Sequence, residues 1–343
     1  MIYIGMDVSS KEFVVHAIDQ RQQKVFEGRI TPSRAGLRQL VKALGVGPKL
    51  FIFEAGNQMK WVALTLMKQE GSRIHVVHPN EIKWINESSG KTDKIDARKL
   101  AHLGRGNLLP RPVHVVEGKA RQLRELVSAR EQLQSKRVAL INTVRGYMKQ
   151  EGVRLPEKFF QRSDWKSVLE AKDLGSTQKV ILKSFMDGIN ALEGSEREIT
   201  EKMIEIQDSR CELLETIPAI GKIASRVLVS AVDDAGRFDN KKCVANYGGL
   251  APTIYQSGGT TNLGRINRDG RQEVRKVLLQ CAHTIQRMVS HDARPIREFF
   301  ERIEKRRGKK RAVVATARKL LTIAYGVLKS GVPYDPMRLR AFA

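Results

Sequence analysis

The first third of the chain alternates short apolar runs with polar turns. Runs at Ile2–Val8, Phe13–Ile18 and Lys24–Ile30 are rich in β-branched and aromatic residues and predict three strands of an antiparallel meander. Two later runs, Leu50–Phe53 and Ile74–Val77, predict further strands, the first of them covered on both faces. Three strands followed by alternating helix and strand is the order of an RNase H-like α/β sheet.

Helical patterns separate these later strands. Thr31 followed by Pro32 is typical of an N-cap and a first helical residue, and leucines at helical spacing follow. A second helix is expected over Trp61–Lys68. We place the end of this α/β domain at residue 118.

The middle of the chain, residues 119–214, carries two long helical patterns. The second has an apolar seam that only Glu196 and Arg210 interrupt, which favours a coiled coil over two helices packed on their own domain. A connector around Pro156 leaves two pairings open, antiparallel within the chain or with another subunit. The seam consists of Leu182, Phe185, Ile189, Leu192, Ile199, Met203, Ile206, Leu213 and Ile217.

The last part, residues 215–343, is expected to be mostly α-helical. The segment Thr216–Gly221 predicts a hairpin between two helices, either a helix-hairpin-helix-like element whose amides meet a phosphate or a plain αα-corner. A glycine-rich loop is expected over 256–270, then a helix from Gln272 and another that starts near Ala312.

Charge narrows the class of partner. The formal net charge is +24 and the pI is near 10.1, which favours a polyanion, either nucleic acid or an anionic membrane. Residues 241–343 hold 22 Lys and Arg against 7 Asp and Glu, a net charge of +15. No apolar run reaches the roughly 18 residues that a membrane span needs. The N-terminus does not resemble a signal peptide, and the three widely spaced cysteines fit a reduced, cytoplasmic setting.

Four acidic residues stand out in this basic chain. Asp93 and Asp96 lie three residues apart, on one face if they are helical, and Asp7 and Glu54 end apolar strands that face the same edge of an RNase H-like sheet. Clustered carboxylates repel one another unless cations neutralise them, and two Mg²⁺ ions roughly 3.5–4 Å apart can stabilise phosphoryl transfer. Each acid alone would be read as a surface carboxylate or a helix cap. The joint pattern predicts a two-metal site for phosphodiester chemistry.

A serine lies at the start of the glycine-rich segment. Ser257 precedes Gly258 and Gly259, which would let a phosphate approach the backbone and leave the hydroxyl uncrowded. No His is near in sequence to act as a base, so activation would come from metal or from the rest of the fold. Alone, this pattern is more often a flexible surface loop.

Basic residues near these acids and this serine are expected to bind nucleic acid. One group flanks the acidic pair and consists of Lys91, Lys94 and Arg98. A second follows the serine and could surround a phosphate: Arg265, Arg268, Arg271 and Arg275. The third is a basic run before the last helix: Lys305, Arg306, Arg307, Lys309, Lys310 and Arg311.

With the acids and the serine both in place, the chain resembles the DEDD transposases of the insertion-sequence family guided by a bridge RNA. The likeness covers nearly the whole chain, as an RuvC-like N-terminal domain and a C-terminal transposase domain. The matching segments are Gly5-Met-Asp7-Val-Ser-Ser-Lys, Phe53-Glu54-Ala-Gly, Lys91-Thr-Asp93-Lys-Ile-Asp96-Ala, Ile217-Pro-Ala-Ile-Gly, Gly249-Leu-Ala-Pro252, Gln256-Ser257-Gly258 and Gly264-Arg-Ile. After Gly264-Arg-Ile this chain has Asn267-Arg268 where the family pattern has a small hydroxyl residue and lysine.

The resemblance implies an RNA-guided DNA recombinase. By analogy Asp7, Glu54, Asp93 and Asp96 hold Mg²⁺, and Ser257 attacks a DNA phosphate to form a covalent serine–DNA intermediate. The implied partners are target and donor DNA, a structured non-coding guide RNA and further copies of the chain, as a dimer or tetramer whose subunits share a site. Such a protein acts on the nucleoid in the prokaryotic cytoplasm.

Two other functions remain open. A structure-selective endonuclease of the Holliday-junction resolvase type would use the same four acids and need no serine. A non-catalytic nucleic-acid-binding protein would need only the basic C-terminal segment.

Overall fold

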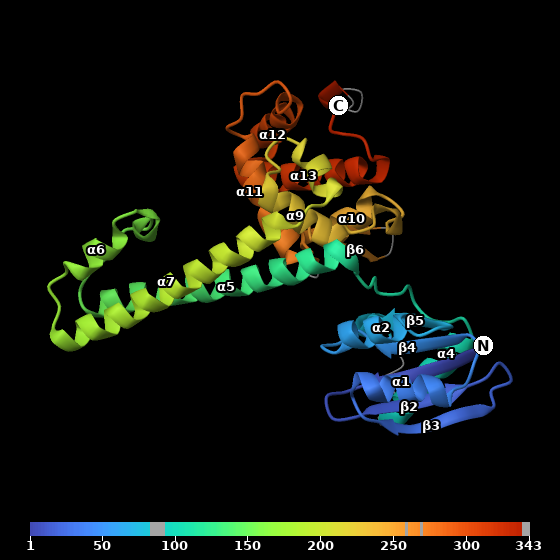
Figure 1. Ribbon diagram of the computed structural model, residues 1–343. Helices are drawn as coiled ribbons and strands as arrows, with labels where there is room; N and C mark the ends of the chain where they lie inside the picture. Colours follow the sequence, from blue (N-terminus) through green and yellow to red (C-terminus); the bar gives the residue numbers. More distant parts are fainter. Residues whose placement is uncertain (83–92, 258–259, 268–269, 338–343) are drawn as a thin grey trace. The chain divides into compact units, whose positions relative to one another are not determined.

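Figure 1 shows a computed structural model of the chain, in which residues 1–82, 93–257, 260–267 and 270–337 are described. The chain divides into two compact units, Met1–Val115 and Val116–Ala343. The first unit is a mixed α/β structure and the second is mainly helical, as the patterns predicted. No helix in the described part of the chain is both long and apolar enough to cross a membrane.

Five strands of the first unit form one sheet in the order β3-β2-β1-β4-β5. The first three form the expected antiparallel meander, whereas β4 runs parallel to both β1 and β5. All five lie where the apolar runs predicted strands. They are β1 (Ile2–Val8), β2 (Phe13–Ile18), β3 (Lys24–Ile30), β4 (Lys49–Glu54) and β5 (Ser72–Val77).

Helices α1 (Arg34–Ala43) and α2 (Met59–Met67) cover one face of this sheet (Figure 1). Their buried side chains pack with Met6, Phe51 and Phe53, which point to that face. A short 3₁₀ turn, η1 (Pro79–Glu81), follows β5.

The N-cap of α1 differs from the expected one. Ser33, not Thr31, caps the helix, and its hydroxyl accepts a hydrogen bond of 3.0 Å from the Gly36 amide. The Ser33 amide in turn donates to the Thr31 carbonyl over 2.7 Å. Because this turn closes before the helix, Thr31 and Pro32 lie outside it.

Helix α4 (Asp93–Arg105) lies on the opposite face of the sheet. Its Leu100 packs with Ile52 of β4. The helix also rests directly on β1, because a side chain at Gly5 would overlap the Ala97 carbonyl. Glycine at this position therefore permits the close approach.

The second unit contains nine helices among the described residues. These are α5 (Gly118–Gln150), α6 (Trp165–Glu170), α7 (Ser176–Glu205), α8 (Ser209–Glu215), α9 (Lys222–Val232), α10 (Lys241–Tyr247), α11 (Gln272–Ile285), α12 (Arg294–Arg307) and α13 (Lys309–Ser330). Helix α13 starts three residues earlier than expected, within the basic run. Two 3₁₀ turns, η2 (Phe159–Gln161) and η3 (Ala235–Arg237), complete the unit.

The long helices α5 and α7 run side by side in opposite directions (Figure 1), so the apolar seam is used within the chain. Glu196 interrupts this seam as a satisfied polar group: it accepts hydrogen bonds from Arg130 (3.2 Å), Gln134 (2.7 Å) and Arg137 (3.1 Å). Such a cluster fixes one register between the helices, because sliding either helix would separate these charged groups from their partners. The predicted seam does not continue on one helix, because α7 ends at Glu205 and Arg210 and Leu213 belong to α8.

Helix α9 forms the centre of the remaining helices and is buried from Ala224 to Val232. Its carbonyl end receives guanidinium groups from three separate segments. Arg124 of α5 donates to the Ser230 carbonyl (2.9 Å), Arg237 of η3 to the Ala231 carbonyl (3.0 Å) and Arg210 of α8 to the Asp233 carbonyl (2.9 Å). Cations at this position offset the negative end of the helix dipole.

A hairpin joins α8 to α9, an arrangement that the helix-hairpin-helix-like element and the plain αα-corner share. Ala219 in this hairpin has a φ of +68°, a conformation that favours glycine. Gly221 is the N-cap of α9, and the next residue, Lys222, is exposed.

The glycine-rich segment does not form a loop throughout. It contains an antiparallel pair, β6 (Pro252–Ser257) and β7 (Thr260–Ile266). The prediction missed β-favouring Thr and Tyr residues on either side of the Gly258-Gly259 pair, a sequence pattern that signals a hairpin.

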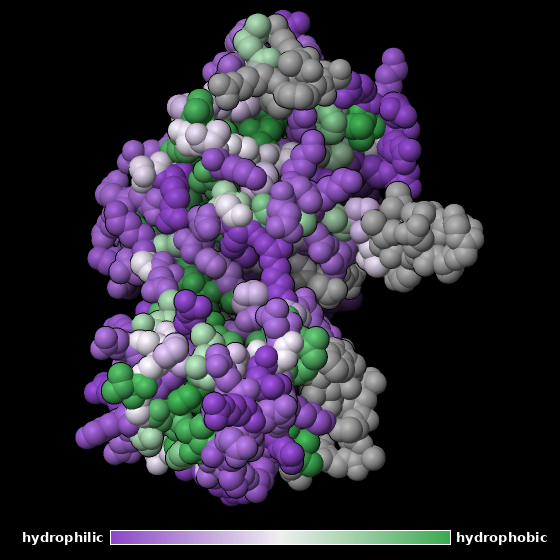
Figure 2. All heavy atoms as spheres, turned by 90° about the vertical axis from the view of Figure 1, so that its right-hand side faces the viewer, coloured by the Kyte–Doolittle hydropathy of each residue, from purple (hydrophilic) through white to green (hydrophobic). Residues whose placement is uncertain are grey.

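The face of the molecule in Figure 2 is largely hydrophilic, with apolar side chains in separate groups.

Candidate functional site

Asp7 and Glu54 end neighbouring strands of the first unit. The parallel register pairs Met6 with Phe53, so Asp7 and Glu54 are the next residues in that register. Side chains alternate along a strand, and the positions two residues earlier, Gly5 and Ile52, both meet α4. Asp7 and Glu54 therefore belong to the face of the sheet that α4 covers.

Asp96 approaches the same face from α4. It lies in the first turn of the helix, directly before Ala97, whose backbone meets Gly5. One carboxylate oxygen of Asp96, Oδ1, is buried and has no hydrogen-bond partner within the described part of the chain. A buried carboxylate oxygen without a partner is costly, and a bound cation would remove that cost.

These carboxylates fit a divalent metal in chemistry. Hard cations such as Mg²⁺ take oxygen ligands, and Asp7, Glu54 and Asp96 offer only oxygens. Among the residues whose side chains are described, no three His, Cys, Asp or Glu groups gather closely enough to hold a metal ion. The side chain of the fourth acid, Asp93, lies outside that set; its backbone begins α4.

Lys94, predicted to bind nucleic acid, pairs with Glu27 of β3. Glu27 also forms an ion pair of 3.1 Å with Lys24, and the hydrogen bonds from Lys94 and Lys24 lower its pKa to about 2. Lys94 thus fastens the start of α4 to the sheet. Of its predicted companions, Arg98 is exposed, and Lys91 lies outside the described residues.

Two histidines that the sequence reasoning missed lie between α4 and the sheet. His16 of β2 is paired in register with Gly5 and with Glu27, and its ring lies 6.2 Å from the ring of His102 in α4. Burial is the main cause that lowers the pKa of both histidines. The alternation of β2 and β3 would have placed His16 and Glu27 on one face, had the strand register been known.

Ser257 is the last residue of β6, and its backbone is paired in register with Thr260 of β7. The glycines that follow it, Gly258 and Gly259, lie outside the described residues, as does Arg268. Arg265 of β7 is exposed.

The other two arginines near the serine contact their own chain. Arg275 donates hydrogen bonds to the carbonyls of Asn267 (3.2 Å) and Gly249 (3.4 Å), and Arg271 forms an ion pair of 2.6 Å with Glu273. Gly249 and Gly270 approach so closely that a side chain on Gly270 would overlap the Gly249 backbone. Arg275 therefore stabilises the base of the β6–β7 hairpin. The sequence spacing of these arginines could not reveal this contact.

The basic run at the α12–α13 junction is fully exposed and forms no ion pair within the described part of the chain. Gly308, with a φ of +79°, joins the two helices. Three of the six cations lie in the first turn of α13, where the positive end of the helix dipole disfavours them. An anionic partner would offset both this repulsion and the mutual repulsion of the six charges. The run consists of Lys305, Arg306, Arg307, Lys309, Lys310 and Arg311.

Two family descriptions match separate parts of the chain. Residues 4–152 match the DEDD transposase family of IS110, and residues 211–301 match the transposase IS116/IS110/IS902 family. The first match includes all four predicted acids, and the second includes Ser257.

Curated relatives cover most of the chain at low identity. The transposase for insertion sequence element IS1111A of Coxiella burnetii is 24% identical over 95% of this chain and 89% of its own length. The transposase for IS1328 of Yersinia enterocolitica is 23% identical over 97% and 98% of the two lengths. A pilin gene-inverting protein of Moraxella bovis is 37% identical over 37% of this chain and 39% of its own length.

Proposed function

Because the chain carries the two transposase domains of the IS110/IS116/IS902 family, we propose that it is a DNA recombinase with a metal-binding acidic site and a serine nucleophile. The observation that carries the proposal is the placement of Asp7, Glu54 and Asp96 on one face of the sheet, with a buried Asp96 oxygen that lacks a partner. The strand order, with β1 between an antiparallel and a parallel neighbour, supports an RNase H-like architecture for this unit.

Asp7, Glu54, Asp93 and Asp96 hold Mg²⁺ in this proposal. Bound Mg²⁺ ions supply charge stabilisation for the attacking and leaving oxygens of a phosphoryl transfer. The packing of α4 against Gly5 and the Lys94–Glu27 ion pair fix the start of α4, and so place Asp93 and Asp96 relative to the strand ends.

Ser257 is the proposed nucleophile. Its Oγ bonds to a DNA phosphorus while the bond from that phosphorus to the 3′-oxygen breaks, so one phosphodiester is exchanged for another. The serine proton leaves as the 3′-oxygen takes one up, and no external reactant is consumed. A 3′-hydroxyl of a different strand then reverses the step and rejoins the DNA. The support for this step is the family likeness and the position of Ser257 at a hairpin end beside Gly258 and Gly259.

The proposed partners are target and donor DNA and a structured guide RNA. The exposed run between α12 and α13 and the net charge of +15 over 241–343 support nucleic-acid binding. We also propose that the protein acts as a homo-oligomer on the prokaryotic nucleoid. Since the seam between α5 and α7 is occupied within the chain, subunits would associate through other surfaces.

Ser257→Ala tests the covalent step. The wild type, incubated with labelled recombination substrates, the guide RNA and Mg²⁺, should give a protein–DNA adduct on a denaturing gel. The variant should lose both adduct and strand exchange while binding DNA and RNA as the wild type does. Undiminished strand exchange by Ser257→Ala would exclude the serine mechanism. Free cleaved ends without adduct in both proteins would instead favour the structure-selective endonuclease.

A further inference from the structure

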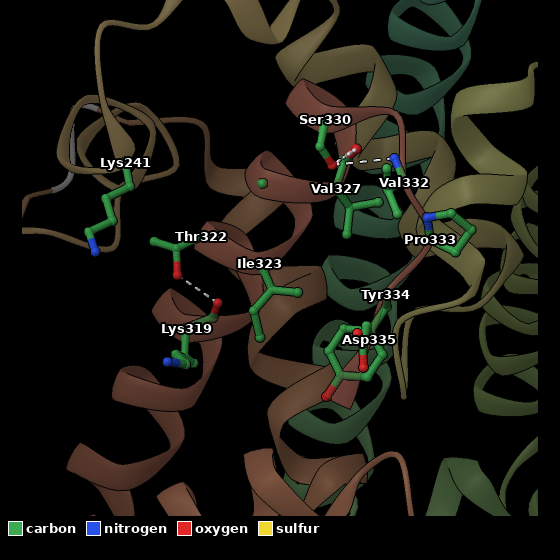
Figure 3. Close-up of a pocket in the computed structure, with 11 residues that line it drawn as sticks. Lys241, Lys319, Thr322, Ile323, Val327, Ser330, Val332, Pro333, Tyr334 and Asp335 are labelled. Carbon is green, nitrogen blue, oxygen red and sulfur yellow. Dashed lines mark hydrogen bonds between the residues drawn. The ribbon is translucent and has the colours of Figure 1, made fainter. Parts of the chain in front are cut away.

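A cavity of about 360 Å³ opens between α10, α13 and the chain that follows α13 (Figure 3). Ile323 and Val327 of α13 form its floor, and Val332 and Pro333 close one side. Lys241 and Lys319 stand on the other side in Figure 3. A volume of this size lies within the range of roughly 300–1,000 Å³ found for small-ligand sites.

The cationic side of the cavity lacks a balancing anion. Within the described part of the chain, neither Lys241 nor Lys319 forms an ion pair with a carboxylate. Burial, together with the charges of Lys241 and Arg302, lowers the pKa of Lys319. Lys319 and Arg302 also lie 5.7 and 5.6 Å from the centre of the Phe299 ring. Asp335 also lines the cavity, beside Tyr334 and away from the two lysines (Figure 3), and its carboxylate accepts a hydrogen bond from the Met337 amide (2.8 Å). Two lysines that form no ion pair with this acid are suited to an anionic ligand.

The remaining wall is apolar at Ile323, Val327 and Pro333 and also carries Tyr334 and Asp335, so it suits a flat group rather than a second anion. The hydroxyls of Thr322 and Ser330 donate to the carbonyls of Lys319 (2.8 Å) and Val327 (3.4 Å), so their protons are already used. Ile323, Val327 and Pro333 therefore present mainly hydrocarbon. One side of the cavity fits a phosphate and the other fits a base.

The cavity also lies on the same helix as part of the basic run. Helix α13 starts in the basic run and reaches Lys319 eight residues after Arg311, a distance of about 12 Å along the axis. Arg318 precedes Lys319 on this path. A strand whose phosphates contact the α12–α13 junction is thus close enough to place its end at the cavity.

We propose that this cavity binds one unpaired nucleotide of a nucleic-acid strand, with its phosphate at Lys241 and Lys319 and its base against Ile323, Val327 and Pro333. The inference rests on the proposed function, because it assumes that the basic segment binds nucleic acid. A base in a duplex is stacked and paired, so only a single strand or a frayed end can enter. The site therefore distinguishes single strands from duplexes.

Filling the cavity without changing charge is the sharpest test. Gly326 lines it, and an added Cβ there would meet no atom within 4 Å, so the side chain of Gly326→Leu starts in open space beside the cavity. Leucine also favours the helix more than glycine does, so misfolding is not expected. In fluorescence anisotropy the variant should bind a short labelled single-stranded RNA about tenfold more weakly, and a duplex of the same length within about twofold. Gly326→Ala, the size control, should behave as the wild type.

Removing charge tests the phosphate side. Lys319→Met and Lys241→Met should each weaken single-strand binding and lower the slope of log affinity against log salt by about 0.7. Lys183→Met removes the same charge from an exposed position of α7 and should leave that slope unchanged. Equal losses on single strands and duplexes in the two cavity variants would mean that these lysines act only as general surface charge, and would overturn the proposal.

The two proposals fail in different ways. If the wild type binds nucleic acid but Gly326→Leu binds single strands equally well, the cavity proposal fails and the proposed function stands. If the wild type binds neither single strands nor duplexes, both fail. A DNA strand of the same sequence shows which nucleic acid enters: a larger effect of Gly326→Leu on RNA assigns the nucleotide to RNA, and a larger effect on DNA assigns it to DNA.

Discussion

Two sheltered carboxylates on helices, Glu196 of α7 and Asp96 of α4, are satisfied to very different degrees. Glu196, whose side chain is 13% exposed, accepts hydrogen bonds from Arg130, Gln134 and Arg137. Asp96 has a buried oxygen with no partner in the described part of the chain. The comparison teaches that neighbouring side chains satisfy the first acid, whereas the second needs a partner from outside the described part of the chain.

Asp96→Asn should have the largest effect of these substitutions, and the property that it changes should be activity. Replacing the carboxylate by an amide of equal size removes a proposed metal ligand, so strand exchange should fall by more than about 10²-fold. Folding stability should stay the same or rise, because a buried charge without a partner is removed. The checks are strand exchange in Mg²⁺ and thermal unfolding of each protein.

The effect of Mg²⁺ on stability should also differ between variants of the two acids, Asp96 and Glu196. Mg²⁺ should raise the melting temperature of the wild type and of Glu196→Gln, but not that of Asp96→Asn, because a ligand stabilises only the protein that binds it. Full strand exchange by the wild type in EDTA would contradict the metal site.

Glu196→Gln should have a smaller effect, and the property that it changes should be folding stability. The change leaves Arg130 without its negative partner and Arg137 with only Glu193, and should cost about 2 kcal/mol in the free energy of unfolding. Glu193→Gln is the matched control, since Glu193 is more exposed and lies 3.7 Å from Arg137. It should change stability by less than about 0.5 kcal/mol. Equal stability of both variants would show that the cluster does not fix the helix pair.

Glu27→Gln should have the smallest effect, and pH should reveal it. The pKa of Glu27 is lowered from 4.5 to about 2, so its ionised form stabilises the folded state above pH 4.5, and this contribution is lost as pH falls from about 4.5 to about 2. The stability difference between the wild type and Glu27→Gln should therefore be constant near neutral pH and vanish toward pH 2. Glu12→Gln, which removes a partner of Arg29, provides the control in the same urea titrations. A difference that grows at low pH would contradict this role.

Much of the first unit could be predicted from the sequence, because each of its strands is a short apolar run bounded by turns. The face shared by Asp7 and Glu54 also follows from the strand order, since parallel neighbours end at one edge. The roles of Glu27 and Lys94 could not be predicted, because their contact depends on where α4 lies across the sheet. The same holds for Arg275, whose partners are backbone carbonyls that come together only when Gly249 meets Gly270.

The three arginines at the end of α9 have a mechanical consequence. Arg124 belongs to the long helix α5, whereas Arg210 and Arg237 belong to the short elements beside α9. The base of the α5–α7 pair is thus fixed to the central helix rather than hinged on it. A rotation applied to the far end of the pair is then transmitted to the body that carries the β6–β7 hairpin, and the long helices act as a lever arm.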